Sequence, residues 1–224
     1  MTADFNEQRL KMVDGQVRTT DVTDVAIIDA MLSVPREEFV PARRRPLAYI
    51  DEDIEIVAAE DGRPARYLME PSPFAKLIQL AGIRPGDFVL DVGCGAGYSS
   101  AVLSRIASFV VALESDAALA AQANTALSGH GYENVAVVEG ALAEGHAAEA
   151  PYDVIVLEGA VDAVSQALLD QLKDGGRLVA IVGEGNAGRA TLYVKEEGLV
   201  SSRHAFDAAV KPLAEFRRAV AFQF

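Results

Sequence analysis

Cysteine, histidine and long apolar runs are scarce in this sequence of 224 residues. The single cysteine, Cys94, cannot form an internal disulfide, and the three histidines do not combine with it in a zinc-binding pattern. No apolar run is long enough to span a bilayer, and residues 1–7 have neither the basic nor the apolar region of a secretory leader. We therefore expect a cytoplasmic protein without a metal site or a membrane partner, in which Cys94 has a packing role.

Positive charge is also scarce. Lysine and arginine number 20 against 33 acidic residues, which gives a formal net charge of −13. Such a chain repels the phosphates of nucleic acid, so we expect no nucleic-acid partner. A hydrophobic fraction of 50% is enough for a full core. These features favour an enzyme, monomeric or homodimeric, that acts on a protein, a peptide or a small molecule.

A glycine-rich turn between a buried strand and a helix is the most informative motif that the sequence does have. The strand covers residues 88–92, and the helix begins near Tyr98. Glycines let a ligand lie against the backbone, and a helix N-terminus offers free N–H groups and a positive dipole end. A second apolar run, 109–113, ends in Glu114, an acid that can accept hydrogen bonds from both hydroxyls of a ribose. The residues of the motif itself are Asp91, Gly93, Gly95 and Gly97.

The spacing of this motif separates two cofactor classes. The NAD-type fingerprint has its third glycine three positions after the second, whereas Gly97 follows Gly95 by two, and Asp91 precedes Gly93 by two. This D-x-G-x-G-x-G pattern resembles the S-adenosylmethionine (SAM) motif of Rossmann-like methyltransferases. The resemblance implies SAM as cofactor and S-adenosylhomocysteine as product. The alternative is a glycine turn that binds no ligand. In that case the position of Glu114 about 20 residues after the motif would be a coincidence.

Apolar runs and helical stretches alternate from residue 88 onward. Alternation of this kind is typical of a parallel sheet covered on both faces, and the final strands should run antiparallel because no long helix separates them. The predicted fold is therefore α/β, a Rossmann-like methyltransferase fold with a mainly parallel seven-stranded sheet. The strands are expected at 88–92, 109–113, 135–139, 153–157, 177–182, 190–195 and 215–223, and the helices at 98–107, 116–128 and 163–172.

The N-terminal part, residues 1–83, is mostly helical by its pattern. Asp24 can cap one helix and Pro71 can start another, while 49–50 and 54–56 resemble short extended pieces. We expect this part to form a cover over the carboxyl edge of the sheet and to exclude water from a pocket there. Residues 84–224 are then the SAM-binding core, and the two parts should make one compact unit.

Several segments outside the glycine motif resemble the protein-L-isoaspartate O-methyltransferase family. They are residues 12–13, 16–18, 34–41, 48–51, 84–87, 150–155 and 171–179. Because they extend over most of the chain, they indicate the family more specifically than the glycine motif does. The resemblance implies carboxyl methylation of isoaspartyl residues in damaged proteins, which is a repair reaction. It also implies a set of cofactor-binding residues, namely Asp91, Gly93, Gly95, Gly97, Glu114, Ser115, Gly140 and Ala141.

The sequence departs from this family where the substrate should bind. The family's element carries threonine and serine hydroxyls for the substrate carboxylate, but Tyr67 and Met69 stand at those positions here. Methionine has no donor for a carboxylate, and the next residue, Glu70, adds negative charge. Ala141 also replaces an aspartate that accepts from the adenine amino group. Glu158, after the fourth strand, falls at the carboxyl edge where ligands bind, and is our further candidate for the substrate pocket.

Three functions therefore remain open. The first is an isoaspartyl methyltransferase that tolerates an altered pocket. The second is a methyltransferase of the same fold with a cationic or neutral substrate, which Glu70 and Glu158 would suit. The third is a non-catalytic SAM-binding or interaction protein. Since the sulfonium of SAM is already activated, methyl transfer depends mainly on alignment. The lack of a catalytic triad excludes none of the three.

Overall fold

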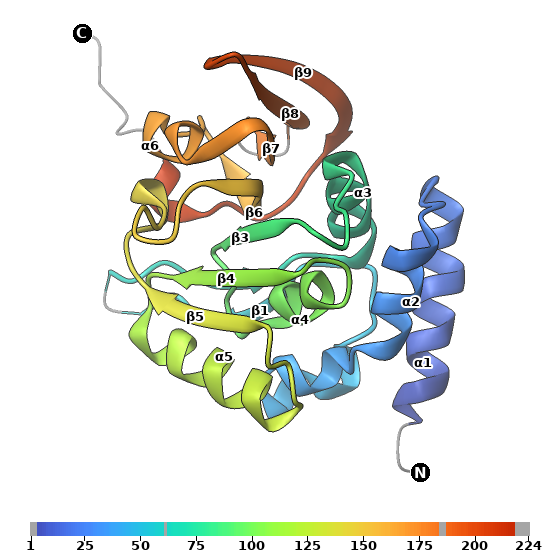
Figure 1. Cartoon of the computed structure of the whole chain (residues 1–224). Helices are drawn as coiled ribbons and strands as arrows, with labels where there is room; N and C mark the ends of the chain where they lie inside the picture. Colours follow the sequence, from blue (N-terminus) through green and yellow to red (C-terminus); the bar gives the residue numbers. More distant parts are fainter. Residues whose placement is uncertain (1–3, 61, 184–186, 218–224) are drawn as a thin grey trace, which may run out of the picture.

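A seven-stranded sheet forms the centre of the computed structural model, which describes residues 4–60, 62–183 and 187–217. The strand order is β5-β4-β3-β6-β7-β8-β9 (Figure 1). The first five of these strands are parallel, whereas β8 and β9 run antiparallel. This arrangement confirms the predicted α/β fold. The strands are β3 (Phe88–Val92), β4 (Phe109–Glu114), β5 (Val135–Glu139), β6 (Tyr152–Val161), β7 (Leu172–Val182), β8 (Gly188–Glu196) and β9 (Leu199–Ala208).

The two faces of the sheet are buried in two hydrophobic clusters. Side chains alternate between the faces of a strand, so Val89 belongs to the larger cluster and Leu90 and Val92 to the smaller one. The larger cluster joins the sheet to the N-terminal helices, and therefore spans both parts of the chain that the sequence separates near residue 83. The helices after the first strand are α4 (Tyr98–Ser104), α5 (Ala117–Gly129) and α6 (Gln166–Asp170).

The N-terminal part combines short helices with one hairpin. Asp24 caps α2 as its position predicts, because its Oδ1 accepts from the backbone N–H of Ala26 at 2.8 Å. Pro71 is the first residue of α3. Residues 49–50 form a turn rather than the expected extended piece. The elements are α1 (Phe5–Met12), a π-helical turn (Val13–Val17), α2 (Val25–Ser33), 3₁₀ turns at Arg18–Thr20, Arg36–Phe39 and Ala42–Leu47, β1 (Ile54–Val57), β2 (Arg66–Leu68) and α3 (Pro71–Ala81).

The segment that reaches the carboxyl edge of the sheet is the β1–β2 hairpin, not the N-terminal helices. The π-helical turn contacts α3, and α2 contacts α4. Helices α1 and α2 lie on the side away from the arrowheads of β4 and β5 (Figure 1). In contrast, Ile56 and Arg66 of the hairpin lie against the glycine turn. The expected cover of that edge is therefore extended rather than helical.

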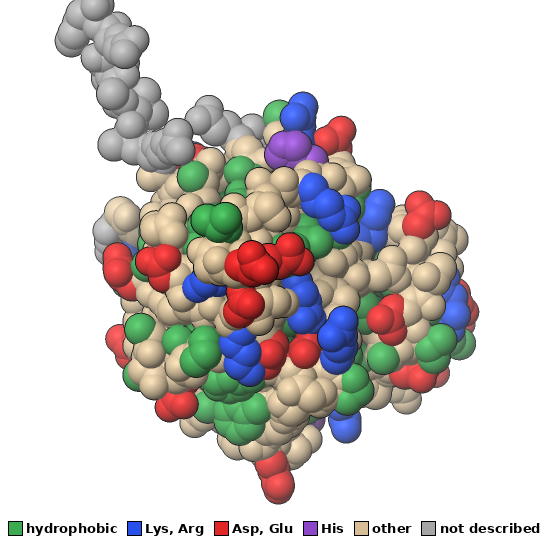
Figure 2. Space-filling view, turned by 45° about the horizontal axis from the view of Figure 1, so that its top comes forward, with side chains coloured by type: hydrophobic (Ala, Val, Ile, Leu, Met, Phe, Trp, Pro, Cys, Tyr) green, Lys and Arg blue, Asp and Glu red, His purple; other side chains and the backbone are tan. Residues whose placement is uncertain are grey.

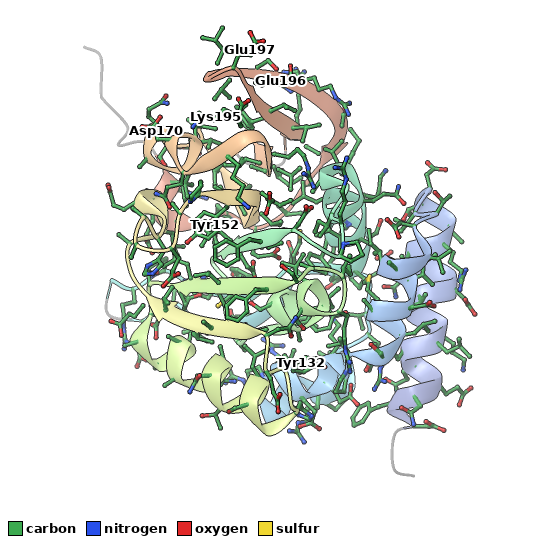
Figure 3. All side chains as sticks on the ribbon, viewed as in Figure 1. Tyr132, Tyr152, Asp170, Lys195, Glu196 and Glu197 are labelled. Carbon is green, nitrogen blue, oxygen red and sulfur yellow. The ribbon has the colours of Figure 1, made fainter. Side chains whose placement is uncertain are left out.

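The sheet ends in a long antiparallel hairpin, of which the sequence predicts the first strand, at 190–195, but not the second. Glu197 and Gly198, with φ of 52° and 76°, form the turn between β8 and β9. Figure 3 shows Glu196 and Glu197 at this tip, and Lys195 donates to the carbonyl of Asp170 at 3.1 Å. The strand predicted at 215–223 is wrong for its described part, where Ala214–Phe216 is a 3₁₀ turn, and residues 218–223 lie outside the described residues.

In the described ranges, no helix has the length and apolar character needed to cross a membrane. Over the same ranges, no group of histidine, cysteine, aspartate and glutamate side chains could hold a metal ion. Figure 2 shows lysine and arginine interspersed with aspartate and glutamate on the face drawn there.

Candidate cofactor and substrate site

The glycine turn has the strand–turn–helix geometry that its sequence predicts. Its three glycines lie in the left-handed region of backbone space, where a Cβ is strained. Asp91, at the end of β3, accepts hydrogen bonds through Oδ2 from the hydroxyls of Ser99 at 2.7 Å and Ser100 at 2.5 Å. This carboxylate therefore ties the strand to the first turn of α4. The φ angles are 83° for Gly93, 56° for Gly95 and 97° for Gly97.

Glu114, the predicted ribose ligand, is fully buried and already has protein partners. Its Oε2 accepts from the backbone N–H of Gly95 at 2.8 Å, and its Oε1 from Ser115 N at 2.9 Å and Asp116 N at 3.1 Å. Arg66 from β2 adds a bidentate ion pair, with Nη1 on Oε1 and Nη2 on Oε2 at 2.7 Å. The sequence does not point to Arg66, because only the folding of the hairpin onto the sheet edge brings it here.

Side chains from two distant segments lie on the glycine turn. A Cβ at Gly93 would be 2.9 Å from Cδ2 of Leu213, and a Cβ at Gly95 would be 2.8 Å from Cδ1 of Ile56. Contacts this short require the neighbouring side chain to move. Packing within the chain therefore already requires glycine at these two positions, independently of the predicted approach by a ligand. Cys94, between them, is buried and free.

A cleft of about 230 Å³ opens beside Glu114. Ser115, one of the predicted cofactor residues, lines this cleft, and so does Leu142. The backbone N–H of Leu142 donates to Oε2 of Glu215 at 3.1 Å. Ala141 is exposed and does not line the cleft, while Gly140 is bonded through its N–H to the carbonyl of Glu114 at 3.0 Å. The remaining lining residues are Arg63, Pro64, Arg66, Asp116, Leu213, Ala214 and Glu215.

Two buried carboxyl groups on the neighbouring strands β3 and β6 carry unpartnered oxygens. Strand β6 continues to Val161, so Glu158 lies within this strand, whereas the sequence predicts it after the end of the strand. Among the described residues, Oδ1 of Asp91 and Oε1 of Glu158 have no hydrogen-bond partner. Burial, together with the charge of Glu114, raises the pKa of Asp91 to about 6. Burial and the charge of Asp91 raise the pKa of Glu158 well above its usual range. Burial therefore disfavours the simultaneous ionisation of both carboxyl groups, and a cation bound between them would favour it.

The substrate element presents little that could hold an anion. Met69 is 3% exposed and packs into the larger hydrophobic cluster. The ring of Tyr67 is half-buried, and Nζ of Lys211 lies 5.7 Å from its centroid. Glu70 is half-buried as well, and burial, with the charges of Asp53 and other nearby acids, raises its pKa to about 7. Acidic side chains therefore gather around this element, and their charges oppose the ionisation of Glu70.

Asp53 connects this element to two other segments. Its Oδ1 accepts from Glu70 N and its Oδ2 from Lys211 N, both at 2.9 Å. The carbonyl of Lys211 in turn accepts from Ala160 N at 3.0 Å, two residues beyond Glu158 on β6. Sequence reasoning missed Asp53, which stands in an acidic run without a motif. The structure brings the hairpin, the substrate element and the C-terminal segment together through this one side chain.

Arg36 is the second buried group that sequence reasoning left without a role. It is 0% exposed and donates to the carbonyl of Ala48 at 2.8 Å and to that of Met69 at 2.7 Å. Its guanidinium lies over the ring of Tyr98, 4.7 Å from the centroid, and burial lowers its pKa. Arg36 therefore fixes the backbone of the substrate element relative to the start of α4.

SAM fits one side of this site directly. Its sulfonium and ammonium groups are cations, and the unpartnered oxygens of Asp91 and Glu158 lie buried next to the glycine turn. On the ribose side, Glu114 has the right chemistry but is paired with Arg66. The donor and acceptor groups present therefore suit SAM, provided that Arg66 leaves the carboxylate.

Comparison with known proteins agrees with this geometry. The family model described as "Protein-L-isoaspartate(D-aspartate) O-methyltransferase (PCMT)" matches residues 7–216. A protein-L-isoaspartate O-methyltransferase of Koribacter versatilis is 36% identical over 209 residues, which cover 93% of this chain and 91% of that protein. One from Methanoculleus marisnigri is 35% identical and covers 87% and 86%, respectively.

Solved structures show the same similarity. A protein-L-isoaspartate O-methyltransferase aligns with a TM-score of 0.78 at 28% identity over 91% of this chain, and this chain spans 65% of the length of that one. A putative family member from Plasmodium falciparum, solved with S-adenosyl-L-homocysteine, has a TM-score of 0.75 at 18% identity, covers 95% and 99% of the two chains, and supports the fold alone. The chain therefore belongs to the protein-L-isoaspartate O-methyltransferase family of SAM-dependent methyltransferases.

Proposed function

We propose that this protein transfers the methyl group of SAM to an acceptor at the carboxyl edge of its sheet, and that an isoaspartyl carboxylate is a poor acceptor. The observation that carries the proposal is the acidic substrate side formed by Asp53, Glu70 and Glu158 next to a glycine turn suited to SAM. When bound, SAM supplies an activated methyl group on a positively charged sulfur. The protein has to hold that charge, align the acceptor and exclude water.

Each of these tasks has residues that suit it. Asp91 and Glu158 offer unpartnered buried oxygens to a positive charge. Ile56 and Leu213 pack on the glycine turn and would keep water from it. Arg36 holds the backbone of the substrate element through the Met69 carbonyl. None of these roles requires proton transfer by a histidine.

An isoaspartyl carboxylate meets two obstacles in this site. Met69 offers no hydroxyl, and its side chain is buried in the core. Glu70, when ionised, repels a second carboxylate, and like charges repel more strongly in a partly buried site than in water. A substrate that is neutral, or that carries its positive charge away from an acceptor atom with a free lone pair, avoids both obstacles. This favours a methyltransferase of the family whose acceptor differs from isoaspartate.

A non-catalytic role is the second candidate, and the Arg66–Glu114 pair favours it. An ion pair with 10% and 0% exposed side chains closes the ribose side without any ligand. A protein that keeps this pair permanently would retain the fold and lose the cofactor.

Calorimetry followed by an activity assay separates these possibilities. We expect the full chain to bind SAM and S-adenosylhomocysteine and to transfer little methyl group to an isoaspartyl peptide. A screen of amine-bearing and neutral peptides with radiolabelled SAM then identifies the acceptor. If neither SAM nor S-adenosylhomocysteine produces binding heat, the protein is a non-catalytic member of the family. If isoaspartyl turnover matches that of ordinary family members, the proposed acceptor class is wrong.

The pH dependence of the residual isoaspartyl activity tests the role of Glu70. Its pKa of about 7 means that it is largely neutral at about pH 6 and largely ionised at about pH 8. Rising pH therefore adds a negative charge beside an acceptor that is anionic throughout this range. We expect the KM for an isoaspartyl peptide to increase from pH 6 to pH 8, and to increase less in Glu70→Gln. The same KM profile in both proteins would show that Glu70 does not face the acceptor.

A further inference from the structure

We propose that Arg66 is an internal competitor of the cofactor, so that SAM binds only after the Arg66 guanidinium has left Glu114. This inference rests on the proposed use of SAM by the chain. Arg66 lies on β2 of the hairpin, and Glu114 ends β4 at the carboxyl edge of the sheet. Together they place a bidentate ion pair at the position where the sequence motif expects a ribose.

Competition follows from the number of acceptor positions on the carboxylate. Each carboxylate oxygen offers about two lone-pair sites. On Glu114, Oε2 accepts from Arg66 and from the backbone N–H of Gly95. Oε1 accepts from Arg66, from the backbone N–H groups of the next two residues and, at 3.4 Å, from the hydroxyl of Ser115. Both oxygens are therefore fully engaged by protein donors, and neither has a site left for a ribose hydroxyl. The backbone donors are fixed by the turn, so Arg66 is the partner that can be exchanged.

The C-terminal segment closes the same cleft from the other side. Leu213 lies on the glycine turn, and Glu215 accepts from the backbone N–H of Leu142 at 3.1 Å. That N–H follows Ala141, where the family resemblance places the adenine. Arg66 of the hairpin therefore occupies the carboxylate of Glu114, which the ribose would otherwise use. Glu215 of the C-terminal segment occupies the N–H of Leu142, which would otherwise be open to the adenine side.

The Arg66–Glu114 ion pair can be replaced by a ligand and does not close the cleft permanently. Nη2 of Arg66 also approaches the carbonyl of Gly93 at 3.4 Å, so the guanidinium is held by exchangeable hydrogen bonds on the cleft side. Glu215 lines the same cleft, which gives a displaced Arg66 an acidic neighbour. The affinity for SAM therefore depends partly on the free energy of the ion pair that has to be broken. Substitutions in the hairpin would change this affinity while leaving the glycine motif as it is.

Calorimetric titration of the full chain with S-adenosylhomocysteine tests the competition. Arg66→Met keeps the length of the side chain but removes the ion pair, and we expect it to bind roughly tenfold more tightly than the wild type. Arg44→Met is the matched control. It removes the same charge from the same N-terminal part, where Arg44 pairs with the partly exposed Glu55, and should leave the affinity unchanged. Circular dichroism checks that both variants are folded.

Arg66→Lys provides a second variant in case a neutral residue beside buried Glu114 prevents folding. It keeps the charge but loses the bidentate geometry, and we expect a smaller gain in the same direction. Wild-type binding without any gain in either Arg66 variant would overturn the inference and leave the proposed function standing. Absence of binding in all folded proteins would overturn the use of SAM, and the inference with it.

Discussion

Replacing Glu114 with alanine should lower the free energy of unfolding by about 3–5 kcal/mol and abolish SAM binding. The substitution leaves Arg66, itself 9% exposed, as a buried charge without its carboxylate. It also removes the acceptor for the backbone N–H of Gly95 and for those of the next two residues after Glu114. The motif alone suggests a ligand residue whose loss leaves the fold intact. The structure shows instead that this side chain holds the hairpin and the glycine turn together, so the predicted ligand residue is also a structural one.

Denaturant unfolding and calorimetry measure these two effects separately. Glu55→Ala is a suitable control because it breaks ion pairs with the more exposed Arg43 and Arg44. Such surface pairs contribute roughly 0–1 kcal/mol. Glu114→Gln keeps the volume and one carbonyl acceptor, so it should lose less stability than alanine while still weakening SAM binding. Equal stability of Glu114→Ala and the wild type would contradict the structural role.

The double variant Tyr67→Thr, Met69→Ser should turn over an isoaspartyl peptide at least roughly tenfold faster than the wild type. It restores two hydroxyls at the positions where the family has them, and a hydrogen bond to a charged group contributes about 1.5–3 kcal/mol. Glu70 still opposes the substrate in this variant, so the activity should remain below that of ordinary family members.

The matched control for this variant is Tyr67→Val, Met69→Ala. Valine and alanine reproduce the shapes of threonine and serine apart from the hydroxyls, and share the cost of truncating Met69, which is buried in the core. A difference in turnover between the two double variants therefore reports the hydroxyls alone. Equal turnover would mean that these positions do not contact the acceptor, and that the alignment of the substrate element is wrong.

Local patterns in the sequence predict the fold well where each element depends on its own residues. The apolar run at 88–92 followed by glycines fixes a buried strand, a turn and a helix, because burial and positive φ angles restrict the choices. The wrong strand prediction at 215–223, made in place of β9, arises because β9 does not have such a local pattern. Strand β9 is exposed along nearly its whole length, so it lacks the apolar alternation that identifies a strand. Its hairpin partner and the turn at Gly198 define it instead.

The candidate site could be predicted only as far as one motif extends. Glu114 and the glycines are close in sequence, and their relation follows from the motif. Arg66, Asp53 and Leu213 reach the same place through tertiary folding, and no short spacing marks them. Sequence reasoning therefore predicts a free ribose acceptor, whereas the structure shows an acceptor that is engaged by the hairpin.

The bond between Asp53 and Lys211 also determines when the site can form during synthesis. It joins positions 158 residues apart, and it completes the cluster that holds Glu70. Closing so long a loop is costly in chain entropy, so such contacts usually follow the local ones. Lys211 follows the last strand of the sheet along the chain, so it leaves the ribosome after all seven strands and long after Asp53. The sheet can begin to assemble earlier, so a newly made molecule should acquire its core before it acquires the ability to recognise an acceptor.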